Sequence, residues 1–295
     1  MNFRPALPPG TVTFRRDRHH LQIGTAPGVS FRDRPGLLAA LRLVDGVRDC
    51  VSLERLAEQI PDFDGSLTAD LLDLHRSGAM LDARAWDVAG PAADEALALA
   101  VEGTSAEEIT ERLGQRAAKT LAFVGDTSCR ALASDIASIT REAGVAHMPN
   151  DESTLTVVMT AGEADREIFA SLVSEGRDHL PVVLSGGVAR WGPVVRPQET
   201  PCVTCHDLHR ADFDPSWSAL VTQFGAGGPR ERVCEALGAA TRHAVAAAIA
   251  ADIVSYCDRI SGPPLIHQVG LGERTSFEVG FHDSCGCRLL SRHLS

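Results

Sequence analysis

The sequence Thr120-Leu-Ala-Phe-Val-Gly125 is a short, continuous apolar run that ends in glycine. An amphipathic stretch from Thr127 to about Glu142 follows this run, and Ala143-Gly144-Val145 comes after it. A buried strand of a parallel sheet has such an unbroken apolar pattern, and the helix that returns the chain to the next strand is amphipathic. This segment therefore predicts the first strand and the first helix of an α/β domain.

The same alternation continues along the chain. Leu155-Thr-Val-Val-Met159 and Leu180-Pro-Val-Val-Leu184 are two further apolar runs, and the stretch from Glu163 to Val173 between them has helical spacing. Strands that alternate with helices at this spacing are typical of a parallel sheet. We therefore predict an α/β domain over residues 118–295.

The predicted domain closes with a helix and two strands. An Ala-rich stretch from Arg232 to Ile260 predicts a long helix. Leu265–Leu271 and Ser276–Phe281 have the pattern of a final pair of strands.

The first 85 residues predict a separate module. Three stretches alternate between apolar and polar residues at strand period, namely 11–16, 21–24 and 29–31. Three helical patterns follow, namely Pro35 to Val44, Ser52 to Ile60, and a third that begins near Ser66. Three short strands with three short helices suggest a winged-helix α+β module over 1–85, and the acidic, Ala-rich residues 86–117 predict a helical linker.

Cys202-Val-Thr-Cys205 and Cys285-Gly-Cys287 are two close pairs of cysteines. A tetrahedral zinc site needs four soft donors, and two short knuckles of this kind supply them. Four thiolates leave no open coordination position, so the predicted zinc is structural. It would hold the C-terminal tail against the loop after the last parallel strand.

Other interpretations of these cysteines remain open. Cys202 to His206 spells C-x-x-C-H, the sequence of covalent haem attachment, but that chemistry belongs to exported proteins. A redox C-x-x-C needs the helix N-terminus of a thioredoxin-like unit, whereas Pro201 precedes this pair. Buried free thiols are the structural alternative, and they account for the cysteines that stand singly in apolar patterns: Cys50, Cys129, Cys234 and Cys257.

The turn after Gly125 is the place where a dinucleotide-binding or ATP-binding fold keeps the pattern G-x-G-x-x-G. Here the three glycine positions hold Gly125, Thr127 and Arg130. The second glycine lets the backbone approach phosphate, and the third lets the helix approach the strand. Threonine and arginine at these positions hinder both close approaches, so the loop predicts a degenerate nucleotide site and no use of ATP.

No catalytic constellation emerges elsewhere in the sequence. Asp207, Asp212 and Asp214 lie close together, but an Asp-rich segment beside a proline is typical of a solvated turn. With four cysteines available as ligands, we interpret His206 and His209 as polar loop residues. These absences favour a binding protein over an enzyme.

Charge and composition exclude several classes of protein. The net charge is -11 at pH 7, and residues 1–85 carry 11 arginines against 11 acidic residues. Nucleic-acid binding needs a positive electrostatic field, so general, sequence-independent binding to nucleic acid is disfavoured. No stretch approaches the roughly 18 unbroken apolar residues of a membrane-spanning helix, and the N-terminus lacks the apolar run of a secretory signal. We therefore expect a cytoplasmic protein with no membrane contact, whose eight cysteines are reduced.

With these motifs in place, the chain resembles the ThiF-like, ubiquitin-activating-enzyme-like partner proteins of YcaO cyclodehydratases. Members of that family are described as leader-peptide-binding or bacteriocin-biosynthesis cyclodehydratase components. The likeness rests on four places: Gly192–Pro197 with Pro201–Arg210 and Asp212–Trp217, then His282–Cys287, then Phe123–Gly125 with Ala143–Val145, and finally residues 11–83. The resemblance implies a ThiF-like, Rossmann-type α/β domain after a small winged-helix domain that recognises leader peptides.

The resemblance also implies a function. It suggests a non-catalytic scaffold whose N-terminal domain captures a precursor peptide, whose α/β body docks on an ATP-using YcaO-type enzyme, and whose zinc stiffens that body. In that family the peptide is taken as an added strand. On this sequence the edge would be Val29, Ser30 and Phe31, and a neighbouring helix would offer Asp70, Leu71 and Leu74. The structural alternative makes Leu71, Leu74 and Phe31 plain core residues.

Two other functions stay open at this point. An ATP-dependent adenylating enzyme of the ThiF/MoeB type would need an acidic magnesium ligand, for which Asp126 and Asp151 are the candidates. A winged-helix DNA-binding regulator is favoured by a basic cluster near the first turn, made of Arg15, Arg16, Arg18, His19 and His20. The balanced charge of that half argues against the regulator. The sequence leaves open whether the chain forms a homodimer.

Overall fold

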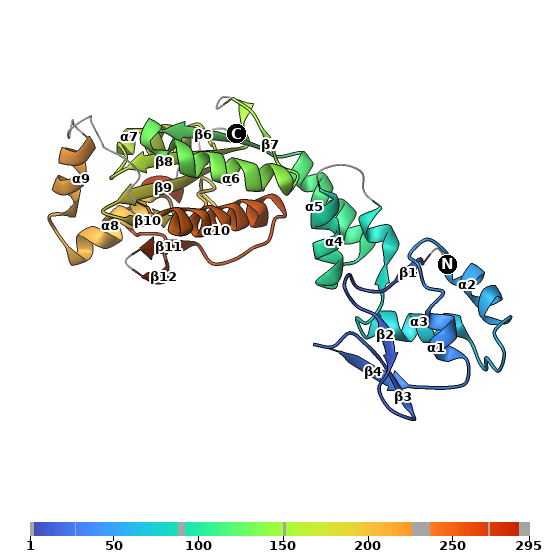
Figure 1. Ribbon diagram of the computed structural model, residues 1–295. Helices are drawn as coiled ribbons and strands as arrows, with labels where there is room; N and C mark the ends of the chain where they lie inside the picture. Colours follow the sequence, from blue (N-terminus) through green and yellow to red (C-terminus); the bar gives the residue numbers. More distant parts are fainter. Residues whose placement is uncertain are drawn as a thin grey trace. The chain divides into compact units, whose positions relative to one another are not determined.

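The chain divides into two compact units, Met1–Leu113 and Gly114–Ser295 (Figure 1). The computed structural model describes residues 3–26, 28–87, 92–149, 152–225, 237–270 and 272–288. Asp151, Cys234, Leu271 and the predicted helical residues 232–236 lie outside the described residues. No helix of the described residues is long and apolar enough to cross a membrane.

The N-terminal unit contains a three-stranded antiparallel sheet with the strand order β2-β3-β4. The strands span Thr13–Arg15 (β2), His20–Ile23 (β3) and Val29–Arg32 (β4), within the stretches that show strand alternation. β1 (Pro5–Ala6) also pairs with β5 (Leu81–Asp82), so the two ends of the module lie side by side. Strands of two residues show no periodicity, which is why the sequence did not predict this pair.

Three helices pack with this sheet around one core. They are α1 (Leu37–Leu41), α2 (Cys50–Ala57) and α3 (Leu67–Arg76). The predicted start of the second helix at Ser52 is wrong, because the Asp49 carboxylate caps the helix by accepting the Ser52 N–H at 2.9 Å. Ser66 caps α3, and its hydroxyl accepts the Ala69 N–H at 3.3 Å.

The acidic, Ala-rich segment after this module forms helices with a small core of their own. A 3-10 helix, η1 (Ala83–Trp86), is followed by α4 (Ala93–Val101) and α5 (Ala106–Ala117). The core of this segment is formed by Ala85, Ala96, Leu99, Ala100 and Ile109.

The C-terminal unit is built on a seven-stranded sheet with the order β12-β11-β10-β9-β8-β6-β7. The parallel strands are β6 (Thr120–Gly125), β7 (Ala146–His147), β8 (Leu155–Ala161) and β9 (His179–Ser185). The sheet continues with three antiparallel pairings through β10 (Val188–Trp191), β11 (Leu265–Gly270) and β12 (Glu273–Glu278). The predicted α/β class is therefore confirmed.

Helices cover both faces of this sheet (Figure 1). α6 (Arg130–Glu142), which follows the 3-10 helix η2 (Thr127–Cys129), and α10 (Ala239–Cys257) pack on one face, where Val157 and Val182 are buried. α7 (Arg166–Ser174) and α8 (Val203–Phe213) cover the other face, where Val158 is buried. Adjacent residues of a strand point to opposite faces, so a sheet buried on both sides requires the unbroken apolar runs seen in the sequence.

One expectation about the first cysteine knuckle is wrong. Residues 203–213 form the helix α8 rather than a loop, and Cys202 is the residue that precedes its first turn. Asp207 and Asp212, predicted to lie in a solvated turn, are thus helical, whereas Asp214 follows the helix and lies beside a turn at Pro215. A further helix, α9 (Trp217–Gly225), comes next, and η4 (Gly286–Arg288) carries Cys287 of the second knuckle.

Candidate functional site

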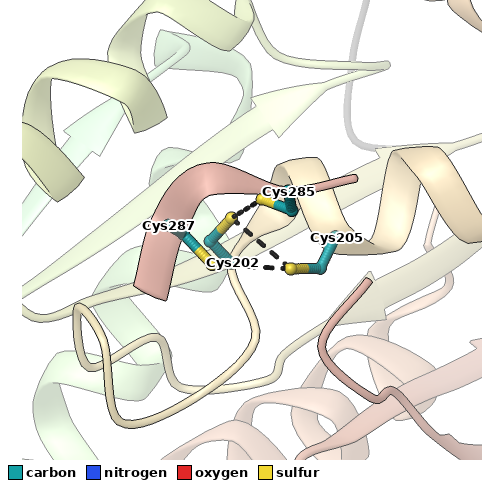
Figure 2. A group of neighbouring side chains, drawn as sticks. All are labelled: Cys202, Cys205, Cys285 and Cys287. Carbon is teal, nitrogen blue, oxygen red and sulfur yellow. Dashed lines mark hydrogen bonds between the residues drawn. The ribbon is translucent and has the colours of Figure 1, made fainter. Parts of the chain in front are cut away.

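The four cysteines of the two knuckles come together in one cluster (Figure 2). The Cys202 sulfur lies 3.9 Å from the Cys205 sulfur and 3.6 Å from the Cys285 sulfur, and the Cys205 and Cys287 sulfurs are 3.6 Å apart. Cys202 and Cys205 come from the start of α8, and Cys285 and Cys287 come from the segment around η4. The predicted grouping of these side chains is thus observed in space.

The dimensions of the cluster match a tetrahedral metal site. With Zn–S bonds of about 2.3 Å, the sulfurs of a tetrahedron lie about 3.8 Å apart. The observed distances of 3.6 to 3.9 Å bracket that value, and none of the four residues forms a disulfide. Val195, Val173 and Phe281 pack around the sulfurs, so the cluster is enclosed by apolar side chains. The donor set fits zinc.

Two thiols of the cluster have raised pKa values. Burial, and after it the neighbouring Cys202 sulfur, raise the pKa of the Cys287 thiol to about 12. The hydrogen bond with Cys205, followed by burial, raises the pKa of the Cys202 thiol. Thiols in this setting do not ionise at neutral pH without a positive charge among them. A redox C-x-x-C needs the opposite, a depressed thiol pKa, so the structure disfavours the redox interpretation.

The loop after β6 is occupied by contacts of the protein itself. Gly125 has a φ of 134°, and a Cβ at this position would overlap the carbonyl oxygen of Met159 on β8. The Asp126 N–H donates to that same oxygen at 2.9 Å, and the Asp126 carboxylate accepts the Ala161 N–H at 2.8 Å. Gly125 is therefore required by the close approach of two strand ends.

The other two glycine positions lie in helices. Thr127 begins η2, and the exposed Arg130 begins α6. The end of β8 is likewise closely covered, because a Cβ at Gly162 would overlap the ring of Phe224 from α9. In open α/β sheets, ligands bind outside the carboxyl ends of the strands. Here the chain's own groups cover the ends of β6 and β8.

A cavity of about 350 Å³ lies beyond the carboxyl end of β9, and Glu163, Ser185, Arg190 and Phe224 are among the residues that line it. Glu163 forms ion pairs with Arg190 and with Arg166. Burial opposes ionisation of Glu163, but the charges of the two arginines outweigh it and lower the pKa of this carboxyl group. Two of the charged residues that line this cavity, Glu163 and Arg190, are thus paired with each other.

The predicted peptide-binding residues fall into two groups. Val29, Ser30 and Phe31 lie on β4, which pairs only with β3 among the described residues and so forms an edge of its sheet. Leu71 and Leu74 are 0% and 5% exposed and belong to the core, as the structural alternative has it. The Asp70 carboxylate forms an ion pair with Arg34, just after β4.

Three side chains of the basic cluster near the first turn, those of Arg15, Arg16 and His20, contact neighbouring polar groups. Arg15 forms an ion pair with Asp33, and the His20 ring lies 3.0 Å from the Asp17 carboxylate. Arg16 donates to the Gln22 side chain at 2.8 Å. These contacts do not favour the DNA-binding alternative, which needs basic side chains available for phosphate.

A second group of metal-type donors was not predicted. One ligand atom each from His209, Asp212 and His282 lie within 4.8 Å of one another. The sequence signal was the spacing of three between His209 and Asp212, which places both on one face of a helix. It was missed because this segment was interpreted as a loop.

Comparison with known proteins agrees with the resemblance at the level of the fold. A scan against protein families finds no match, and a search of curated proteins finds none either. Among solved structures, the chain is similar to a "Heterocyclase in complex with substrate and Cofactor" (20% identity, TM-score 0.64), to the heterocyclase TruD (17%, 0.66) and to E. coli MccB (12%, 0.56).

These three matches cover 97%, 97% and 96% of this chain. The chain spans only 39% and 42% of the two heterocyclases but 96% of MccB. At these sequence identities the likeness shows a shared fold.

Proposed function

We propose that the chain is a scaffold that binds a precursor peptide along β4 and presents it to a separate YcaO-type cyclodehydratase. In this proposal residues 1–85 serve as a winged-helix recognition domain, a structural zinc at the four cysteines stiffens the α/β domain, and the chain itself does not use ATP. The observation that carries the proposal is the outer edge of β4, which pairs with no other strand in the part of the chain that the structure describes.

The hydrogen-bond register identifies which groups would meet the peptide. Residues of an antiparallel strand alternate between those bonded to the partner strand and those whose backbone groups point away. The Asp33 N–H donates to the His19 carbonyl at 2.7 Å, so Phe31 and Val29 belong to the set bonded to β3. The backbone N–H and C=O groups of Ser30 and Arg32 therefore face the open edge, where an added strand would pair with them.

The lengths of the structural neighbours support a separate partner. More than half of each heterocyclase lies outside the part that this chain matches. The proposal assigns the chemical step to such a partner chain. The occupied loop at Gly125 and Asp126 supports this division, because it leaves the usual phosphate position filled by backbone and carboxylate contacts.

Peptide binding is tested with fluorescein-labelled synthetic peptides that carry the N-terminal regions of short open reading frames found near this chain's gene. Ser30→Pro removes the outward N–H but leaves the bonds to β3 intact, so fluorescence anisotropy should show at least about a tenfold loss of affinity. Ser30→Ala keeps the N–H and should bind like wild type. Thr13→Pro, on the opposite edge strand β2, should also bind the peptide like wild type.

Two results would contradict the proposal. One is wild-type binding no tighter than that of a scrambled peptide. The other is equal binding by Ser30→Pro and Ser30→Ala.

An adenylating enzyme is the second candidate. The end-to-end match to MccB and the cavity beside Glu163 and Arg190 favour it. ATP–pyrophosphate exchange by the purified chain separates the two functions. The scaffold proposal expects exchange at the level of buffer alone, and exchange that requires the protein would favour the enzyme.

A further inference from the structure

We propose that His209, Asp212 and His282 form a second zinc site, distinct from the cysteine cluster and with a coordination position left open. The three side chains come from two segments that are far apart in sequence. His209 and Asp212 lie on α8, three residues apart, and His282 lies on the segment between β12 and η4. Each offers one ligand atom within 4.8 Å of the other two.

Contacts already hold the three side chains together. The His282 Nε2 atom is 3.1 Å from the Asp212 carboxylate, and the rings of His209 and His282 meet edge to face with their centroids 4.8 Å apart. The side chain of His282 is only 13% exposed, whereas that of Asp212 is 63% exposed. The site is therefore anchored on one side and open to solvent on the other.

Backbone groups fix the state of both imidazoles. The His209 Nε2 atom lies 3.2 Å from the Gly280 carbonyl, which can only accept, so Nε2 carries the proton and Nδ1 keeps a lone pair. The Ser284 N–H donates to His282 Nδ1 at 3.1 Å, so the proton of the neutral ring is on Nε2 and is donated to Asp212. The Gly280 contact is the usual support of a metal-binding histidine, which donates its other ring N–H to an acceptor. The Ser284 contact differs, because His282 Nδ1 accepts in it.

The donor set determines the class of metal. Two imidazole nitrogens and one carboxylate oxygen suit zinc, and three protein ligands leave a fourth position for water or another donor. Binding at His282 Nε2 would move the ring proton to Nδ1 by exchange with solvent, so the ring stays neutral, and the bond to the metal would replace the hydrogen bonds with Asp212 and Ser284. The alternative is a hydrogen-bonded His–Asp pair that takes no metal.

The two interpretations differ in the number of zinc ions that the full-length protein binds. The protein is stripped with a chelator under reducing conditions and titrated with zinc chloride, with binding followed by calorimetry and bound metal measured by mass spectrometry. We expect two equivalents for wild type. We expect one for His282→Ala and for Asp212→Asn, with affinity at the lost site reduced at least about 100-fold.

The controls separate this site from the cysteine cluster. His243→Ala removes another histidine beside a carboxylate, that of Asp135, and should keep both equivalents. Cys205→Ala should lose the cysteine-bound equivalent and keep the one that depends on Asp212. The exposed Asp212 makes Asp212→Asn the variant least able to disturb folding.

Cobalt(II) gives an independent readout, since only ions on thiolates produce intense sulfur charge-transfer absorption. The second equivalent of cobalt should add weak bands without further charge transfer, and Asp212→Asn should remove them. The proposal is overturned if wild type binds no metal beyond the cysteine site. It is also overturned if Asp212→Asn and His282→Ala bind as much zinc as wild type.

Discussion

The two ends of the parallel strands in the C-terminal unit differ in how their polar groups are used. Near the amino end of β9, where His179 pairs with Val195, four sulfurs surround a common centre with few other partners. At the carboxyl end of β6, the loop at Gly125 and Asp126 is bonded to β8. Polar groups with few partners in the protein indicate a ligand site, whereas polar groups that bond to the protein itself stabilise the fold.

The largest effect is expected when one sulfur of the cysteine cluster is removed. Cys205→Ala should abolish one equivalent of bound zinc and lower the free energy of unfolding by about 5 kcal/mol or more, because structural zinc contributes folding energy directly. Cys257→Ala removes an equally buried thiol from the main core and should cost only about 1–2 kcal/mol, with zinc content unchanged. Zinc analysis and urea unfolding measure both. Equal effects of the two substitutions would show that the cluster holds no structural metal.

At the other end, Gly125→Ala tests whether the glycine serves the strand contact. The added methyl group meets the Met159 carbonyl in a left-handed backbone conformation, so we expect a loss of about 3 kcal/mol of unfolding free energy. Gly176→Ala is the matched control, since its φ is 68° and nothing lies within 4 Å of the added Cβ. It should cost about 1 kcal/mol. Similar costs for the two variants would contradict the structural role of Gly125.

His179 gives the amino end of β9 a pH dependence. Burial lowers the pKa of this histidine to about 4, so the native state holds it neutral while the unfolded chain protonates it near pH 6.5. Its contribution to stability is present above pH 6.5 and is lost as the pH falls toward 4. Between pH 7.5 and 5 we expect wild type to lose about 2 kcal/mol more than His179→Phe, as measured by urea unfolding.

Zinc release also weakens the protein in acid, but it affects wild type and His179→Phe alike and cancels in their difference. His243→Ala, at a side chain that is 62% exposed, should follow the wild-type profile. Parallel curves for wild type and His179→Phe would refute the assignment.

The smallest effect is expected at Asp126. Asp126→Asn keeps an oxygen that can accept the Ala161 N–H and loses only the charge, so stability should fall by about 1 kcal/mol. ATP–pyrophosphate exchange should stay at the buffer level in both proteins. Exchange that is present in wild type and lost in Asp126→Asn would make this residue a magnesium ligand and reverse the comparison.

The parts that sequence reasoning found are those with local signals. The apolar run at 120–125 is β6 residue for residue, and the runs at 155–159 and 180–184 lie within β8 and β9. Cysteine spacing likewise identified four side chains that meet in space, because a knuckle brings its own two sulfurs together. A continuously buried strand and a short-range pair of ligands can both be recognised from residues that are close in the sequence.

The parts that were missed have other causes. β10 follows Gly186 and Gly187, whose φ angles of 61° and 78° make the tight turn typical of a hairpin, but Val188-Ala-Arg-Trp191 does not alternate cleanly between apolar and polar residues. α8 was taken for a loop because it is rich in cysteine, histidine and aspartate, and the packing of Val203 with Val158 of β8 and with α7 outweighs their weak helix propensity. The contact of His282 with α8 depends on how α9, α10, β11 and β12, which separate them in the sequence, fold. No local sequence signal could therefore reveal it.

The cysteine cluster joins residues that the ribosome makes at different times. Cys202 and Cys205 are synthesised well before Cys285 and Cys287, with α10 and the two outer strands of the sheet between them. During that interval the first two thiols have no partners from the second knuckle, so they are exposed to oxidants and to stray metal ions. Correct assembly of this protein should therefore depend on the reducing power of its surroundings while it is being translated.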